Sequence, residues 1–175
     1  MITIVTRFAK TQLSRSVAAV RFIFKKMDYV PIKLKLEKRS LDISATYDGL
    51  LIVREKFRAL FIENEWRGLE FRALPLEPGF YQIVASERVE FDYYRRNTRF
   101  SDKCEQCGEF RSVAGATPAF LGENRTIPAK HFVRTDLEFG TGLEKSPLLI
   151  CGTEVGQALR SAKLKGLELK EILTE

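Results

Sequence analysis

Two cysteines separated by two residues and followed by a glycine form the most chemically specific motif in the chain. Cys104-Glu-Gln-Cys107-Gly108 has the spacing of a zinc knuckle, in which two thiolates bind the metal and the glycine permits a tight turn. A structural zinc needs four ligands, and the chain holds only Cys151 and His131 as further cysteine or histidine candidates. Cys151 lies in an apolar run typical of a core strand. Three interpretations therefore stay open: a bound zinc, a degenerate remnant of a zinc knuckle, and a redox pair.

A second candidate site combines aromatic rings with arginines at Tyr93, Tyr94, Arg95 and Arg96. Such rings can stack on nucleic-acid bases while guanidinium groups neutralise phosphates. Tyrosine and arginine also dominate the binding energy of protein–protein interfaces. Acidic residues flank this strip and dilute its positive field, so we favour the end of a strand with solvated arginines. The strip is a weak candidate for a partner-binding surface.

The sequence predicts no catalytic site. A single histidine excludes sites that need two histidine ligands, and neither a GxSxG nor a GxGxxG motif is present. The segment 140–146 resembles a phosphate-binding loop, but its glycines and lysine have the wrong spacing. Asp136 is explained as an ordinary aspartate at a strand end. We therefore expect a protein that is not an enzyme and needs no cofactor, apart from the zinc considered above.

Length and composition indicate one globular domain. The chain has 175 residues, of which 45% are apolar and 30% charged. No apolar run approaches the ~18–20 residues of a membrane span, so we expect no membrane insertion. Three cysteines cannot form a disulfide framework, and an odd number suits a reducing compartment such as the cytoplasm.

The net charge of +6 belongs to the first 27 residues. They contain six basic and no acidic side chains, whereas the rest of the chain carries 23 of each. The basic character therefore says little about what the body of the protein binds. We interpret residues 1–27 as a packed element or an extension preceding a start at Met27, and the alternatives are a flexible basic arm or a membrane, targeting or nucleic-acid-binding role. Residues 28–175 are expected to form a single α+β domain.

An internal repeat is the most informative feature of the organisation. Residues 50–74 and 148–172 align without a gap at an offset of 98, with six identities that include Leu-Leu-Ile at the start and Gly-Leu-Glu near the end. Each copy reads as an apolar strand, an amphipathic helix and a half-buried strand. Gly68 and Gly166 stand where the helices are expected to end, in the left-handed conformation.

The rest of the chain adds strands around these two units. Residues 31–46 predict an N-terminal β-hairpin, since apolar residues alternate with polar ones on both sides of a turn. Further strands are predicted at 79–84, 88–94 and 131–135. The expected fold class is α+β: a mixed sheet with two repeated strand–helix–strand units and an N-terminal β-hairpin.

The segments CEQCG, HFVRTDLEFG, SPLLICGTEV and LKGLELKEI together resemble a known family. They are similar to immunity proteins of bacterial polymorphic toxin systems, in particular the double-CxxCG immunity proteins, over roughly residues 47–175. Those proteins carry two cysteine pairs, and this chain keeps only Cys104 and Cys107.

The resemblance implies a non-enzymatic inhibitor that binds a cognate toxin domain in the cytoplasm and blocks its active site. The alternative is a nucleic-acid-binding module that uses the basic N-terminal arm and the Tyr-Tyr-Arg-Arg strip. The sequence favours the toxin as partner over nucleic acid and gives no indication of the oligomeric state.

Overall fold

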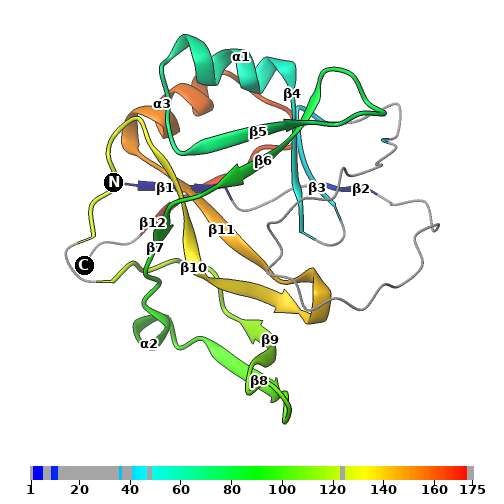
Figure 1. The fold of residues 1–175 in the computed structure, drawn as a ribbon. Coiled ribbons are helices and arrows are strands. Elements are labelled where there is room, and N and C mark those ends of the chain that lie inside the picture. Colours follow the sequence, from blue (N-terminus) through cyan, green and yellow to red (C-terminus); the bar gives the residue numbers. More distant parts are fainter. Residues whose placement is uncertain are drawn as a thin grey trace.

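A computed structural model describes residues 2–5, 9–11, 36, 41–46, 49–122 and 125–172, which form two β-sheets with two nine-residue helices (Figure 1). The five-stranded sheet has the spatial order β2 (Ala9–Thr11), β3 (Ile43–Thr46), β4 (Leu51–Arg54), β6 (Phe80–Ala85) and β5 (Leu69–Ala73). The seven-stranded sheet has the order β12 (Leu169–Ile172), β1 (Ile2–Val5), β11 (Ser146–Cys151), β10 (Phe132–Thr141), β9 (Phe110–Ala114) and β8 (Arg99–Lys103), and β7 (Arg88–Val89) also pairs with β10. The helices are α1 (Glu55–Glu63), the one-turn α2 (Tyr93–Arg96) and α3 (Thr153–Ser161), with a 3₁₀ turn at Gly142–Glu144.

The predicted α+β class is confirmed, although the strands divide into two sheets and not one. Each sheet is mixed, because β2 pairs in parallel with β3 and β7 in parallel with β10, while the other pairs are antiparallel. Within the described residues, no helix is long and apolar enough to cross a membrane.

Both copies of the repeat fold as strand, helix and strand. The first copy forms β4, α1 and β5, and the second forms β11, α3 and β12. Helices α1 and α3 begin and end at equivalent residues, since 55 and 63 become 153 and 161 at the offset of 98. The repeat seen in the sequence is therefore a repeat of structure.

The strand pairing extends this duplication beyond the sequence match. Leu51 of β4 pairs with Ile83 of β6, and its equivalent Leu149 of β11 pairs with Val5 of β1. Strand β1 is thus the antiparallel neighbour of β11 as β6 is of β4, although β1 comes from the opposite end of the chain. We call β3, β4, α1, β5 and β6 the first unit, and β10, β11, α3, β12 and β1 the second unit.

The short strands that follow β6 and β1 cross between the units. After β6, β7 pairs with β10 of the second unit, with Arg88 opposite Arg134. After β1, β2 pairs with β3 of the first unit, with Lys10 opposite Ala45. Lys10 and Arg88 differ by 78 residues, the same offset that separates Val5 from Ile83. Each unit therefore contributes one strand to the other's sheet.

The turn that follows each repeat helix lies against the opposite unit. The backbone carbonyl of Arg67 accepts the N–H of Phe132 at 2.9 Å, and the equivalent carbonyl of Lys165 accepts the N–H of Ile43 at 3.1 Å. The next residues, Gly68 and Gly166, have φ of +90° and +86°. The predicted left-handed conformation is confirmed, but both glycines lie five residues beyond the helix ends, where they permit close contact with another strand.

The main core joins the two units with unequal side chains. The first unit supplies rings, and the equivalent positions of the second supply aliphatic groups: Phe57, Phe61, Trp66 and Phe71 correspond to Val155, Leu159, Leu164 and Leu169. Phe132 of the second unit packs among the rings of the first, with its centroid 5.9 Å from that of Trp66 and 6.1 Å from that of Phe57. The units therefore share one core.

The strand predicted at 88–94 differs from the structure. Residues 79–84 form β6 as expected, but the strand expected at 88–94 is reduced to the two-residue β7, and α2 begins at Tyr93. In the predicted N-terminal hairpin, residues 31–35 and the turn at 37–40 lie outside the described residues. Its second strand forms β3, which has β2 on one side and β4 on the other.

We predict that Gly166→Ala destabilises the protein far more than Gly79→Ala. Both glycines have a positive φ, so each alanine costs about 1 kcal/mol in backbone strain. A Cβ on Gly166 would also lie 2.2 Å from the carbonyl oxygen of Ile43, whereas a Cβ on Gly79 would meet nothing within 4 Å. The clash should add roughly 2–3 kcal/mol. Urea unfolding followed by the fluorescence of the single tryptophan, Trp66, measures both; equal losses would contradict the close approach.

We also predict that a chain starting at Met27 fails to fold. It would lack β1, whose backbone pairs with β11 on one side and β12 on the other, and leave both strands with an unpaired edge. Thr3→Pro tests the same point at full length, because proline removes a donor from a strand with neighbours on both sides. Circular dichroism and solubility are the measurements. A folded, cooperatively melting Met27 variant would instead favour residues 1–26 as an extension.

Candidate functional site

Helix α2 and the β8–β9 hairpin stand apart from the two repeated units (Figure 1). We call residues 92–114 the aromatic lobe. It joins the seven-stranded sheet where Gly140 and Thr141 of β10 pair with Val113 and Ser112 of β9. Lys145 Nζ also donates to the carbonyl oxygen of Phe110 at 2.8 Å. Both predicted sites, the tyrosine–arginine strip and the cysteine pair, belong to this lobe.

The strip is a single helical turn and not the predicted strand end. Asp92 caps it, since its Oδ1 accepts the backbone N–H of Arg95 at 2.8 Å. Asn97 ends it in the left-handed conformation with φ of +55°. The sequence signal for this turn was present in Asp92 and Asn97, two residue types that favour helix caps and left-handed positions.

The two tyrosines present an exposed pair of rings. Tyr94 is 81% exposed and Tyr93 41%, and their ring centroids are 4.4 Å apart. A hydrogen bond to Tyr94 raises the pKa of Tyr93 above its ordinary value. Tyr93 also lies edge-on to Phe100, with centroids 5.6 Å apart, and Phe100 lies 5.3 Å from Phe110. These rings form a continuous row from α2 to the hairpin.

An open hollow lies beside this row. Tyr93, Phe100 and Phe110 line it together with Phe91, Asp136 and Leu137. Asp136 is held in place at its edge, because its Oδ1 accepts the backbone N–H of Phe91 at 2.9 Å. Phe110 was not among the residues predicted for the site. Its contribution depends on the β8–β9 pairing, and a single aromatic residue after the cysteine motif gives no signal of that.

The two arginines of the strip are engaged in the protein itself. The guanidinium group of Arg95 lies over the ring of Phe120, 4.8 Å from its centroid. Arg96 donates from Nη2 to the carbonyl oxygen of Thr117, and its Nε is buried without a hydrogen-bond partner. Arg96 therefore holds the loop after β9 against α2. The exposed chemistry of the strip consists mainly of its two phenol rings.

The cysteine pair occupies the turn between β8 and β9. The backbone N–H groups of Cys107 and Gln106 donate to the sulfur of Cys104, and these bonds, with a further one from the Cys107 side chain, lower the pKa of Cys104 to about 7. Gly108 closes the turn with φ of +74°, and its N–H donates to the carbonyl oxygen of Cys104 at 2.8 Å. The predicted tight turn at this glycine is confirmed.

The described residues do not gather a set of zinc ligands around the cysteine pair. In the described part of the chain, no three histidine, cysteine, aspartate or glutamate side chains gather as metal ligands. Cys151 is fully buried in β11, where burial raises the pKa of its thiol to about 12. His131 is paired with Glu87, with 2.8 Å between Nε2 and Oε1. Within the described residues, Cys104 and Cys107 therefore have no further ligands beside them that would complete tetrahedral coordination.

Comparison of the chain with protein-family models, with curated proteins and with solved structures finds no match.

We predict that Cys104 is the most reactive thiol and that its alkylation follows a pKa of about 7. Below this pH the thiol is protonated and reaction slows, whereas above it the nucleophilic thiolate predominates. Cys107→Ser should move the midpoint upwards by weakening the hydrogen bonds to the Cys104 sulfur. Rates with iodoacetamide between pH 5 and 9, resolved by peptide mass spectrometry, measure this. Buried Cys151 is the internal control, and a Cys104 midpoint near that of an ordinary cysteine would contradict the hydrogen-bonded turn.

Proposed function

We propose that this protein binds another protein through the aromatic lobe and that it acts as an immunity protein against a toxin domain. The observation that carries the binding role is the exposed Tyr93–Tyr94 pair beside the hollow lined by Phe100 and Phe110. Rings exposed on a protruding surface, next to a depression that can accept a partner's side chain, are typical of binding hot spots.

The local structure suits such a role because it fixes the rings in advance. Asp92 caps the turn that carries both tyrosines, and Phe100 supports Tyr93 from the adjacent strand. A tyrosine has only two side-chain torsions, so binding costs little additional conformational entropy. The lobe can therefore contribute a preformed contact surface, which favours tight inhibition.

The charges of the lobe favour a protein over a nucleic acid. Residues 92–114 contain five basic and four acidic side chains, so their net charge is +1. Arg95 and Arg96 already contact Phe120 and Thr117. A phosphate-binding surface needs several free cations in one field. The nucleic-acid module considered from the sequence is therefore the weaker proposal.

The class of partner comes from the resemblance to polymorphic-toxin immunity proteins. On that basis the partner is a toxin domain, the site of action is the cytoplasm, and the mechanism is steric blockage without catalysis. No cofactor takes part in this mechanism. The lobe would cover the toxin's active site or an adjacent surface, and its near-neutral charge suits a contact dominated by packed rings.

The test pairs this chain with the toxin domain encoded beside its gene. Wild-type protein should form a stable complex and restore growth, whereas Tyr94→Ala should weaken binding by ten- to a hundred-fold, as expected for a hot-spot aromatic. Ile62→Ala is the matched control, since Ile62 is a 57% exposed apolar residue of α1, outside the lobe. Calorimetry and growth curves are the measurements.

Two outcomes would overturn the proposal. If the wild-type chain neither binds nor protects, the immunity role is wrong. If Tyr94→Ala and Ile62→Ala behave alike in an otherwise stable complex, the lobe is not the binding surface. Binding to single-stranded oligonucleotides that weakens steeply with salt would support the nucleic-acid alternative instead.

A further inference from the structure

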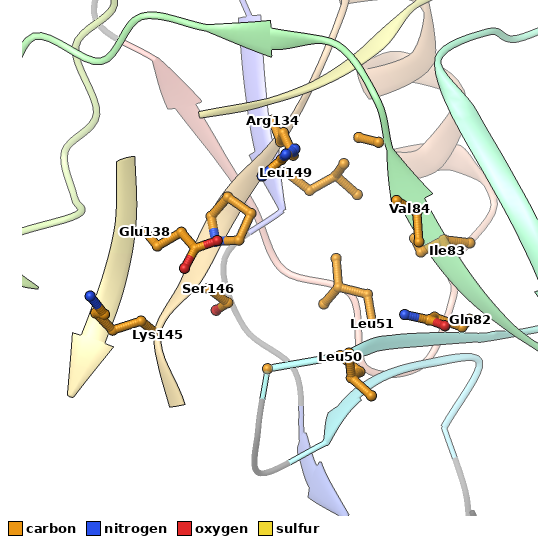
Figure 2. A pocket seen from close by; sticks show the side chains of 13 residues that line it. Leu50, Leu51, Gln82, Ile83, Val84, Arg134, Glu138, Lys145, Ser146 and Leu149 are labelled. Atoms are coloured by element: carbon orange, nitrogen blue, oxygen red, sulfur yellow. The ribbon is translucent and has the colours of Figure 1, made fainter. Parts of the chain in front are cut away.

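A cavity of about 80 Å³ lies between the two units (Figure 2). Strands β4 and β6 of the first unit line one side, and β10 and β11 of the second unit line the other. Leu51 and Leu149, which are equivalent residues of the repeat, both line it, and Val84 adds to the apolar wall. The half-buried Gly49 and Ser146 also belong to the lining.

An irregularity in β10 places charged groups at this cavity. Arg134 pairs with Leu149 and Glu138 pairs with Pro147, so four steps along β10 match only two along β11. The hydroxyl of Thr135 stabilises the bulge, since it accepts the N–H of Leu148 at 2.9 Å and donates to the carbonyl oxygen of Leu137 at 2.7 Å. Arg134 and Glu138 both line the cavity on the β10 side (Figure 2).

Arg134 is a buried cation that forms no ion pair with any carboxylate of the described residues. Only 7% of the residue is exposed, its Nε has no hydrogen-bond partner, and no carboxylate of the described residues lies within 4.0 Å of its guanidinium nitrogens. Burial and the like charge of Arg88 on the paired strand lower the pKa of Arg134, and Glu138 only partly opposes them. A buried, unpaired charge is costly, and an anion in the cavity would relieve that cost.

We propose that this cavity binds a small monocarboxylate, with the guanidinium of Arg134 holding the carboxylate and Leu51, Val84 and Leu149 contacting a short apolar tail. This site is separate from the aromatic lobe, and it does not depend on the toxin-binding role.

The size and charge of the cavity select this class of ligand. Its volume is about half of the roughly 150 Å³ of an apolar cavity that takes benzene, so it suits a ligand with fewer heavy atoms than benzene, such as the five of propionate. The charged residues that line the cavity are Arg134, Lys145 and Glu138, and their charges sum to +1, which one carboxylate neutralises and a phosphate dianion would exceed. The planar guanidinium matches the two oxygens of a carboxylate.

The test titrates sodium propionate against propionamide, its neutral analogue of the same shape, at constant ionic strength. Methyl NMR resonances of Leu51, Val84 and Leu149 should shift and saturate with propionate at millimolar concentration. Propionamide should bind at least tenfold more weakly. Arg134→Met should also weaken propionate binding at least tenfold, and it should fold, because an apolar side chain replaces an unpaired buried charge.

Arg134→Lys retains the charge without the planar fork, so its affinity for propionate should fall between those of the wild type and Arg134→Met. Arg160→Met is the control: this residue of α3 is paired with Glu171 and does not line the cavity, so propionate binding should not change. Absent methyl shifts, equal shifts with propionamide, or unchanged binding in both Arg134 variants would overturn the proposal. Stronger binding of inorganic phosphate than of propionate would overturn the carboxylate assignment.

Discussion

The reciprocal approach of two glycine turns to two strands is the constraint on which the fold depends. A strand–helix–strand unit cannot cover its own apolar surfaces, so each needs a neighbour. Here each unit places the turn after its helix against the first strand of the other, so close that a Cβ would lie 2.0 Å from the carbonyl oxygen of Phe132 at Gly68 and 2.2 Å from that of Ile43 at Gly166. Neither unit can move without breaking hydrogen bonds to the other.

The unequal core follows from this arrangement. If both units had the same aromatic side chains, the equivalent positions would place rings against rings in the shared core. A single core could not hold all of these rings at normal packing density. Phe57 is instead matched by Val155, and Trp66 by Leu164. Phe132 is an exception, since here the second unit has the ring and the equivalent residue of the first unit is Ile43. Phe132 packs against the rings of the first unit, because the turn at Arg67 and Gly68 contacts its strand. The two units can therefore share the same backbone arrangement while their core side chains differ in volume and fit together.

The sequence allowed prediction of what is local. Apolar periodicity and the 98-residue offset predicted both helices with their flanking strands, and the glycine types predicted the left-handed turns at Gly68 and Gly166. Pairings between distant segments were not predictable in the same way. Nothing in the pattern of residues 2–5 shows that they lie between β11 and β12, and nothing near Arg134 shows a cavity formed with strands some fifty to eighty residues earlier. The tyrosine strip has a strand-like composition, but the flanking cap residues Asp92 and Asn97 stabilise a helical turn there instead.

The aromatic lobe and the cavity differ in how far their residues can change without disturbing the duplicated fold. The lobe lies between the last strand of the first unit and the first strand of the second, and no reciprocal contact passes through it, so its surface can change without loss of the shared core. That freedom suits a surface that must match one partner. The cavity is bounded by strands of both units, and its shape follows from their registers. Arg134 is therefore a charged residue within the rigid part of the protein, where a cation without an ion-pair partner among the described residues calls for a functional explanation.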